Sequence, residues 1–534
     1  MKNILKKFPK EIIFLFFLIL VCKSLLILTA FIQAEVVEGM LQMNLSIVLR
    51  KSLRLFIIYL IYLIITYCQL RYTSIFKQRV SFKLRNQLAD NLSKLQYQDY
   101  KKTDSSSYVS WLNNDINHIE VEGTQNAINI LADSIEVILS VGALLTFHYS
   151  LIISTLIAIV ILLQLPKLVN TYLNQAAYQL AQSRERFVSH TSDVLKGFDT
   201  LYVFLEHNFF KRAIFDASND LKSHENQYNR MISIVALLGG LGNVISQVSI
   251  FVLTAYLAVQ GIVPRAAIVA TTNLASKIFN VVGNLSQTLV NFNSVSPIIQ
   301  KLNCIDSCNS KNNNPIEHNI KVDNTTIKIK NLSYNYGSKN VFEQLSFTIY
   351  PGKKYAILGD SGSGKSTLLN ILTGKLTDYS GSITLDGHEI NQLSASYIFN
   401  KISYIDQKPY FFNRSLRENL TLGNQFTDDQ LWSVLKKVNM DQLIAQLPDQ
   451  LNSLIGEGGN NFSGGQLQRI AVARALLRNK SILFIDEATA NLDEQSTLQI
   501  EDLVLSQSNL TVVLISHHLK AENITKFDYV IQLT

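Results

Sequence analysis

Long uncharged runs alternate with charged stretches along the first 300 residues of the chain. Six runs are candidates for membrane-spanning helices: residues 12–32, 53–70, 127–147, 151–165, 231–260 and 266–290. A helix rises about 1.5 Å per residue, so about 20 apolar residues cross a hydrocarbon layer about 30 Å thick. The second and fourth runs are individually short, whereas the fifth has 30 consecutive uncharged residues. The pattern predicts an all-α domain of six transmembrane helices.

The distribution of Lys and Arg predicts the orientation of these helices. Four basic residues precede the first run, eight lie in residues 71–126 and seven in residues 172–230. The opposite loops hold only Arg50, Lys51, Arg54 and Arg265. Because basic loops stay on the cytoplasmic side, we expect both termini in the cytoplasm. The cluster from Arg50 to Arg54 fits an extended second helix whose outer end is exposed to water.

The two inner connections, residues 71–126 and 172–230, are much longer than the outer loops. We expect the helices to continue into the cytosol as legs of about 20 residues, roughly 30 Å long. The legs are predicted to end in turns within KKTDSSSYVSWLNNDINHIE and LKGFDTLYVFLEHNFF, where they are positioned to contact a soluble domain.

Two lysines, Lys23 and Lys277, lie deep inside apolar runs, where a charge is costly. One interpretation is that they line a hydrophilic pathway that attracts an anionic group. The other is that they pair with Asp133 and Glu136 of the third run. Four amides are open to a similar choice between pathway and interhelical hydrogen bonds, with the second favoured: Asn243, Gln247, Asn280 and Asn284.

Composition supports the membrane interpretation over nucleic-acid binding. The chain is 47% hydrophobic and carries a net charge of +7. Its Lys and Arg residues gather at the ends of apolar runs rather than in one basic stripe, so no nucleic-acid partner is expected. Four cysteines, two of them in apolar runs, give no disulfide framework. The abundance of Asn, Lys and Ile favours an AT-rich bacterial genome and hence the plasma membrane.

A change of composition divides the chain into domains. Residues 303–324 are polar and rich in asparagine, which predicts a linker. Residues 325–534 then alternate strand-like runs such as KYAILG, ISYID, SILFIDE and TVVLIS with helical ones, which indicates an α/β domain. The predicted organisation is a transmembrane domain in residues 1–302, the linker, and an α/β domain in residues 325–534.

The stretch GDSGSGKST fits the phosphate-binding pattern GxxxxGKS between a predicted strand and a predicted helix. Glycines let backbone N–H groups surround phosphate oxygens, and the helix start adds partial positive charge. Lys365 is expected to reach the outer phosphates, and Ser366 to bind magnesium. The candidate nucleotide-binding residues here are Gly359, Asp360, Ser361, Gly362, Ser363, Gly364, Lys365, Ser366 and Thr367.

Two carboxylates end the apolar strand ILFIDE. The carboxyl edge of a parallel sheet lies beside the phosphate loop, which places Asp486 and Glu487 at the predicted site. We expect Asp486 to hold the magnesium shell. Glu487 would orient or deprotonate the attacking water, because phosphoryl transfer needs positioning and charge stabilisation.

A second helix start with phosphate-binding character lies in NFSGGQLQRIAVARALL, where a small polar residue and two glycines precede a long helix. Either the chain holds two anions, or this helix start serves a nucleotide bound to another copy. Both alternatives stay open at this point.

Taken together, these motifs resemble the ATP-binding cassette (ABC) transporters of the exporter branch, over nearly the whole chain. The resemblance covers the six-helix membrane domain and a P-loop domain of ABC type. It makes FSGGQ the signature that caps ATP on the opposing subunit, so that two composite sites form in a dimer. The signature residues are Ser463, Gly464, Gly465 and Gln466. The Gly-Glu-rich stretch LIGEGG before the signature is similar to an exporter-specific loop.

The resemblance also implies roles for single residues. Tyr336 would stack on adenine, with Tyr334 as the competing choice, since stacking needs only an exposed aromatic face. Gln407 would link magnesium to the membrane domain, and Asp493 would reach across the dimer interface to the opposing subunit. His517 would be the switch histidine at the γ-phosphate, with His518 incidental.

The function predicted from the sequence is an ATP hydrolase that exports a peptide, lipid or amphipathic compound, with ATP and Mg²⁺ as cofactors and a second copy or homologous subunit as partner. An intact set of motifs slightly favours a homodimer. The alternative is a membrane-bound ABC ATPase with a regulatory or immunity role and no transport.

Overall fold

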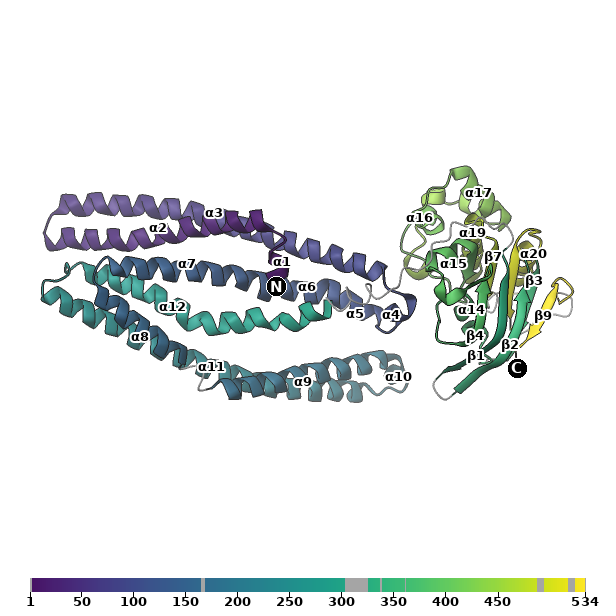
Figure 1. Ribbon diagram of the computed structural model, residues 1–534, viewed down its shortest axis with the longest axis horizontal. Coiled ribbons are helices and arrows are strands. Elements are labelled where there is room, and N and C mark those ends of the chain that lie inside the picture. The colour runs from purple at the N-terminus through teal and green to yellow at the C-terminus, as the bar shows by residue number, and fades with distance from the viewer. Residues whose placement is uncertain are drawn as a thin grey trace. The chain divides into compact units, whose positions relative to one another are not determined.

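Figure 1 shows a computed structural model that describes residues 2–164, 169–302, 325–336, 339–360, 362–486, 494–516 and 524–533. The chain forms two compact units. The first consists of Met1–Leu95 and Thr103–Asn309, and the second of Gln96–Lys102 and Ser310–Thr534. The linker predicted for residues 303–324 lies outside the described residues.

The elements of the first unit are helices. They are α1 (Lys2–Leu5), α2 (Pro9–Leu41), α3 (Leu45–Ser93), α5 (Ser105–Ser110), η1 (Trp111–Asp115), α6 (Ile116–His118), η2 (Ile119–Thr124), α7 (Gln125–Leu145), α8 (Tyr149–Gln164), α9 (Asn170–Lys196), α10 (Phe198–Val203), α11 (His207–Val259) and α12 (Ala267–Ser294). The predicted apolar runs lie in α2, α3, α7, α8, α11 and α12. The ends agree to within about two residues for the runs in α7 and α8, whereas α2, α3 and α11 extend well beyond their runs and α12 ends four residues later than its run.

Among the described residues, four segments are long and apolar enough to cross a membrane: Pro9–Leu41, Leu45–Ser93, Ser105–Leu145 and His207–Val259. Tyr149–Leu162 is apolar but shorter. The helical membrane domain is therefore confirmed, while the number of six crossings stays a prediction.

The second helix extends well beyond its apolar run, as the sequence predicted. It begins at Leu45, so Arg50, Lys51 and Arg54 lie in its first turns. Asn44 caps the helix, because its side chain accepts a hydrogen bond from the backbone N–H of Ile47 at 3.2 Å. Lys51 pairs with Glu35 of α2 at 2.6 Å, which gives one of these charges a local partner.

The inner connections are mostly helical. Helices α3 and α9 run on to Ser93 and Lys196, and α11 begins at His207, so the predicted turn around α10 is confirmed. The other predicted turn is wrong over most of its length, since residues 105–124 form a helical run with two π-helical segments. Some of its polar side chains bond to neighbouring helices: Ser81 of α3 donates to Glu120 at 2.6 Å.

Helix α2 packs against α3, α7 and α12, whereas α11 packs against α8, α9 and α12. Leu144, Leu151, Ile250, Leu274 and Phe279 are fully buried in one core of this unit. The outward side of α3 exposes large apolar side chains, which is the pattern expected of a helix that faces lipid. Cys22 and Cys68 are free thiols.

The second unit contains two sheets. The antiparallel sheet has the order β2-β1-β4-β5, with β1 (Ile327–Tyr336), β2 (Lys339–Ile349), β4 (Ser380–Leu385) and β5 (His388–Glu389). The parallel sheet has the order β6-β7-β8-β3-β9, with β3 (Lys354–Leu358), β6 (Ile402–Ile405), β7 (Ile482–Asp486), β8 (Thr511–Ser516) and β9 (Tyr529–Gln532). The four strands predicted from KYAILG, ISYID, SILFIDE and TVVLIS are confirmed.

The second unit also contains helices, which lie beside these sheets (Figure 1). They are α4 (Tyr97–Lys101), α14 (Lys365–Leu372), η4 (Ile390–Gln392), α15 (Ala395–Lys401), α16 (Leu416–Thr421), α17 (Asp428–Lys437), α18 (Asp441–Ala445), η5 (Gln450–Asn452), η6 (Glu457–Gly459), α19 (Gly464–Leu477) and α20 (Glu494–Leu505). All five residues of β7 are buried, as expected of a parallel strand covered on both faces. The carboxyl ends of β3, β7 and β8 meet at one edge.

Candidate functional site

The loop between β3 and α14 needs its glycines. A Cβ on Gly359 would lie 2.6 Å from both the carbonyl oxygen of Leu533 and Oγ of Ser363. Gly364 has a φ of +87°, and a Cβ there would lie 2.3 Å from Cγ1 of Val341. Side chains at these positions would force the loop open, so the tight turn that a phosphate cradle requires depends on glycine here.

Lys365 is the first residue of α14, and only 4% of it is exposed. Its ammonium donates to the carbonyl oxygens of Gly359 and Asp360, both at 2.8 Å. The loop thus folds around the ammonium and holds this charge at the helix start. The same charge and the first N–H groups of α14 face an anion bound in the loop.

Ser366 and Asp486 are brought together across the carboxyl edge of the sheet. The hydroxyl of Ser366 donates to Oδ1 of Asp486 at 3.0 Å. Asp486 ends β7 and is 5% exposed. A hydroxyl and a carboxylate are the hard oxygen donors that Mg²⁺ prefers beside phosphates, so these two residues fit that ion. The described residues contain no group of three or more His, Cys, Asp or Glu side chains that could hold a metal ion.

Tyr404 of β6 is a residue that the sequence analysis missed. Its hydroxyl donates to Oδ2 of Asp486 at 3.1 Å. Burial and the neighbouring carboxylates of Asp486 and Asp406 raise the pKa of Tyr404, so its hydroxyl stays protonated and available as a donor. The ammonium of Lys375 lies 3.9 Å from the centre of the Tyr404 ring, and burial lowers the pKa of Lys375. No short sequence motif marks Tyr404 or Lys375 as a neighbour of Asp486, and their proximity becomes visible only in the folded chain.

The choice between the two tyrosines offered for adenine stacking stays a prediction. Tyr334 is 8% exposed and packs in the core of the second unit, so its ring has no free face. Tyr336 ends β1, where its backbone pairs with that of Lys339, and it remains the choice. Gln407 lies just after β6 with an exposed side chain.

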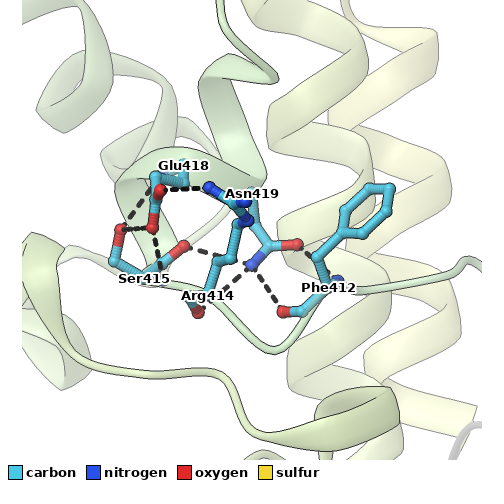
Figure 2. Close-up of polar contacts among 5 residues, drawn as sticks. All are labelled: Phe412, Arg414, Ser415, Glu418 and Asn419. Carbon is cyan, nitrogen blue, oxygen red and sulfur yellow. Dashed lines mark hydrogen bonds and ion pairs between the residues drawn. The ribbon is translucent and has the colours of Figure 1, made fainter. Parts of the chain in front are cut away.

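The segment after Gln407 is held in place by a dense set of hydrogen bonds (Figure 2). The side chain of Asn419, which is fully buried, accepts from the backbone N–H of Phe412 at 2.9 Å and donates to its carbonyl oxygen at 2.9 Å. Ser415 and Glu418 form a capping box at the start of α16. The loop that carries Gln407 is therefore fixed at both ends, by β6 before it and by this turn after it.

The second predicted helix start is confirmed. Ser463 caps α19, its Oγ accepting from the backbone N–H of Gln466 at 3.3 Å. The side-chain oxygen of Gln466 accepts in return from the N–H of Ser463 at 2.9 Å, which completes a capping box. Apart from its chain neighbours and the nearby backbone of α19 itself, no described heavy atom lies within 4 Å of a Cβ built on Gly464. The exposed start of α19 therefore has open space in front of it within this subunit.

Several predicted site residues lie outside the described residues. They are Ser361, Glu487, Asp493, His517 and its neighbour His518. Their roles stay predictions from the sequence. The described members of the phosphate loop, including Gly362, Ser363 and Thr367, lie where the sequence placed them, between β3 and the first turn of α14.

The charges deep in the membrane domain have partners within it. Lys23 of α2 forms an ion pair with Glu136 of α7, so the pairing interpretation is confirmed for this lysine. Lys277 of α12 instead donates to the carbonyl oxygen of Leu26 at 2.7 Å.

Asn243 of α11 donates to Asn280 of α12 at 2.6 Å, which is an interhelical bond, and Gln247 donates to Asn243 at 2.8 Å within α11. These bonds favour the structural role that the sequence analysis preferred for the amides.

A helical membrane unit followed by a phosphate-loop ATPase unit defines a membrane transport ATPase. Residues 12–282 match the family model of the ABC transporter transmembrane region, and residues 342–490 match that of ABC transporter. The first match spans more than half of the chain, so the chain belongs to the ABC transporter family. It is a membrane protein that binds ATP and hydrolyses it.

Three relatives illustrate the similarity. The chain is 25% identical over 489 residues to the uncharacterized ABC transporter ATP-binding protein YwjA of Bacillus subtilis (strain 168), which covers 89% of this chain and 83% of the relative. It is 35% identical over 249 residues to the multidrug resistance-like ATP-binding protein MdlB of Buchnera aphidicola subsp. Schizaphis graminum (strain Sg), covering 44% of this chain and 42% of the relative. It is 35% identical over 196 residues to the mycobactin import ATP-binding/permease protein IrtB of Mycolicibacterium thermoresistibile, covering 36% and 34%.

A solved structure shares the fold of the whole chain. It is the structure of a bacterial Atm1-family ABC exporter with ATP bound, with a TM-score of 0.84 and 18% sequence identity. The match covers 100% of this chain and 94% of that chain. The fold of this protein is thus that of an ABC exporter, with the membrane and ATPase domains fused in one chain.

Proposed function

We propose that the protein is a half-transporter that works as a homodimer and uses ATP to export a peptide, lipid or amphipathic compound across the plasma membrane. Both termini would lie in the cytoplasm, as the distribution of Lys and Arg indicates. The observation that carries the proposal is the pairing of Ser366 with Asp486 in a chain that also holds a helical membrane domain.

The dimer follows from the exposed start of α19. A capped helix start with two glycines binds anions well, yet apart from the neighbouring residues and the backbone of α19 itself no described atom of this subunit lies within 4 Å of a Cβ on Gly464. We infer that a nucleotide on a second copy fills this space, and that each ATP is clamped between the phosphate loop of one copy and residues 463–466 of the other. Asp493 and His517 would contribute to the same two composite sites.

Magnesium would be held by Ser366 and Asp486, with Gln407 completing the shell. When bound, Mg²⁺ neutralises charge on the β- and γ-phosphates. Lys365 would bind the outer phosphates through its ammonium, and Glu487 would accept the proton of the attacking water. Tyr336 would stack on adenine.

Closure of the dimer on ATP would drive the movement of the membrane helices. ATP shifts the protein toward the closed state only by as much as it binds that state more tightly, so binding is the power step and hydrolysis resets the protein. The turn around α10 exposes Tyr202, Val203, Phe204 and Leu205, an apolar patch that is costly in water. We propose that this patch transmits the movement between an ATPase unit and the helices.

The direction of transport is proposed to be outward. Fusion of the two domains, the long helical legs and the LIGEGG stretch support export. The names of relatives include both a multidrug resistance-like protein and a mycobactin import protein, so direction needs its own test.

The test is transport into liposomes that carry the purified protein with its ATPase units outside. A panel of labelled peptides, lipids and amphipathic compounds is offered with ATP, and Lys365→Ala serves as the control that cannot use ATP. We expect ATP-dependent accumulation of at least one class in the lumen with the unchanged protein alone. ATPase activity without movement of any class would instead support a regulatory role.

A further inference from the structure

Tyr404 stands at the centre of a set of contacts that ends at Asp486. It is partly buried in β6, which pairs with β7 so that Tyr404 lies beside Phe484, two residues before Asp486. The carboxylate of Asp486 therefore receives two hydroxyl hydrogen bonds, from Ser366 on Oδ1 at 3.0 Å and from Tyr404 on Oδ2 at 3.1 Å. With both oxygens occupied, the plane of the carboxylate is fixed relative to α14.

The face of the Tyr404 ring carries a cation. The ammonium of Lys375 lies 3.9 Å from its centre, close enough for a cation–π interaction. Lys375 also lies 5.3 Å from the centre of the Tyr97 ring, in the segment Gln96–Lys102 of the same compact unit. Gln98 of this segment donates to Thr377 at 3.2 Å, two residues after Lys375. The rings of Tyr404 and Tyr97 thus both lie close to the Lys375 ammonium, and the bond from Gln98 to Thr377 fixes the segment that carries Tyr97.

We propose that Tyr404 is a positioning residue for Asp486, and that Lys375 strengthens its action by polarising the tyrosine ring. The hydroxyl aims the carboxylate so that Oδ1 stays beside Ser366, where magnesium is proposed to bind. A cation on the ring face withdraws electron density from the hydroxyl and makes it a better donor. The inference rests on the proposed role of Asp486 as a magnesium ligand, and it extends the site to two residues outside the nucleotide-binding motifs.

The first test removes the hydroxyl in the full-length protein. Tyr404→Phe is compared with Tyr379→Phe, because the Tyr379 hydroxyl is buried in the same unit without a hydrogen-bond partner. The readout is the dissociation constant of Mn²⁺, measured by electron paramagnetic resonance with a non-hydrolysable ATP analogue bound. We expect Tyr404→Phe to raise this constant about tenfold, the size expected for a lost hydrogen bond to a charged group. Analogue binding in EDTA should change less than about twofold.

The second test asks whether Lys375 acts through that hydroxyl. Lys375→Met keeps most of the apolar stem and removes the charge. We expect it to raise the Mn²⁺ dissociation constant about threefold in the unchanged protein and not at all in the Tyr404→Phe background. The same factor in both backgrounds would show that Lys375 acts independently and would overturn its part of the proposal.

Asp486→Asn separates this inference from the proposed function. If Asp486→Asn leaves Mn²⁺ binding unchanged, the magnesium site itself is wrong, and the inference falls with it. If Asp486→Asn weakens Mn²⁺ binding while Tyr404→Phe leaves it within about twofold of the unchanged protein, only the positioning role is wrong.

Discussion

The hydroxyl of Ser366, in the first turn of α14, donates to Oδ1 of Asp486, the last residue of β7, at 3.0 Å. The two groups lie 120 residues apart in sequence. Their contact joins the helix start that binds phosphate to the strand end that carries the carboxylate. The oxygen ligands proposed for magnesium are thus already in place within one subunit, which limits the reorganisation needed on binding.

Removal of the Ser366 hydroxyl should therefore weaken magnesium more than nucleotide. We expect Ser366→Ala to raise the Mg²⁺ concentration for half-maximal ATPase at least about tenfold, while ATP binding in EDTA stays within about twofold. Ser380→Ala is the control, because the exposed Ser380 hydroxyl bonds only to the carbonyl oxygen of Ser333. An equal loss of ATP binding in EDTA would contradict the role of Ser366 as a metal ligand.

The proposed roles of Glu487 and the dimer predict a trapped state. In the purified protein, Glu487→Gln should bind ATP normally and lower ATP turnover at least about tenfold, because the attacking water is no longer activated. The two ATPase units should then stay closed on ATP, which a non-exchangeable bound nucleotide after gel filtration would reveal. Unchanged turnover would remove Glu487 from the mechanism.

The partly buried ion pair between Lys23 and Glu136 predicts an asymmetric response to substitution. Either Lys23→Met or Glu136→Gln leaves a partner uncompensated and should lower the free energy of unfolding by about 3–5 kcal/mol. The combination of Lys23→Met with Glu136→Leu should recover most of this loss, since no charge is left buried alone. Thermal unfolding in detergent measures all three variants. Unchanged stability with altered transport would instead favour the pathway interpretation.

The turn in Figure 2 predicts an effect on the stability of the second unit. Asn419→Ala removes an acceptor from the N–H of Phe412 and donors from the carbonyl oxygens of Phe412, Arg414 and Ser415. Since these groups lie around a fully buried side chain, we expect a loss of about 3 kcal/mol in the free energy of unfolding. Asn424→Ala, on an exposed side chain with one bond of 3.3 Å, should cost less than about 0.5 kcal/mol. Equal effects of the two changes would contradict this account.

The main elements of both units could be predicted from the sequence because their signals are local. Uncharged runs of residues indicated the membrane helices, and short apolar runs indicated the strands of the parallel sheet. The phosphate loop was recognisable because Gly359 and Gly364 serve a backbone geometry that other residues obstruct. The capping box at Ser463 was likewise encoded within a few residues.

The rest depended on contacts between distant residues. Residues 105–124 were expected to form a turn because they are polar, yet their polar side chains are used by neighbouring helices, as with Ser81 and Glu120. Tyr334 and Tyr336 could not be separated until the fold placed Tyr334 in a core. Lys375 lies in an unremarkable stretch, and the sequence marked Tyr404 only as part of a predicted strand. The pairing of β6 with β7 brings Tyr404 to Asp486, and the Lys375 ammonium lies over the Tyr404 ring.

The most direct test of the central claim asks whether the phosphate loop of one copy meets the signature of another. Asp360→Cys and Ser463→Cys are placed on two differently tagged chains without other cysteines, and oxidation is followed with and without ATP in the Glu487→Gln background. The account predicts a disulfide between the two chains that forms only with ATP and is lost when Lys365→Ala is added. No disulfide between the two chains in the presence of ATP, or one that forms equally well without ATP, would contradict the account.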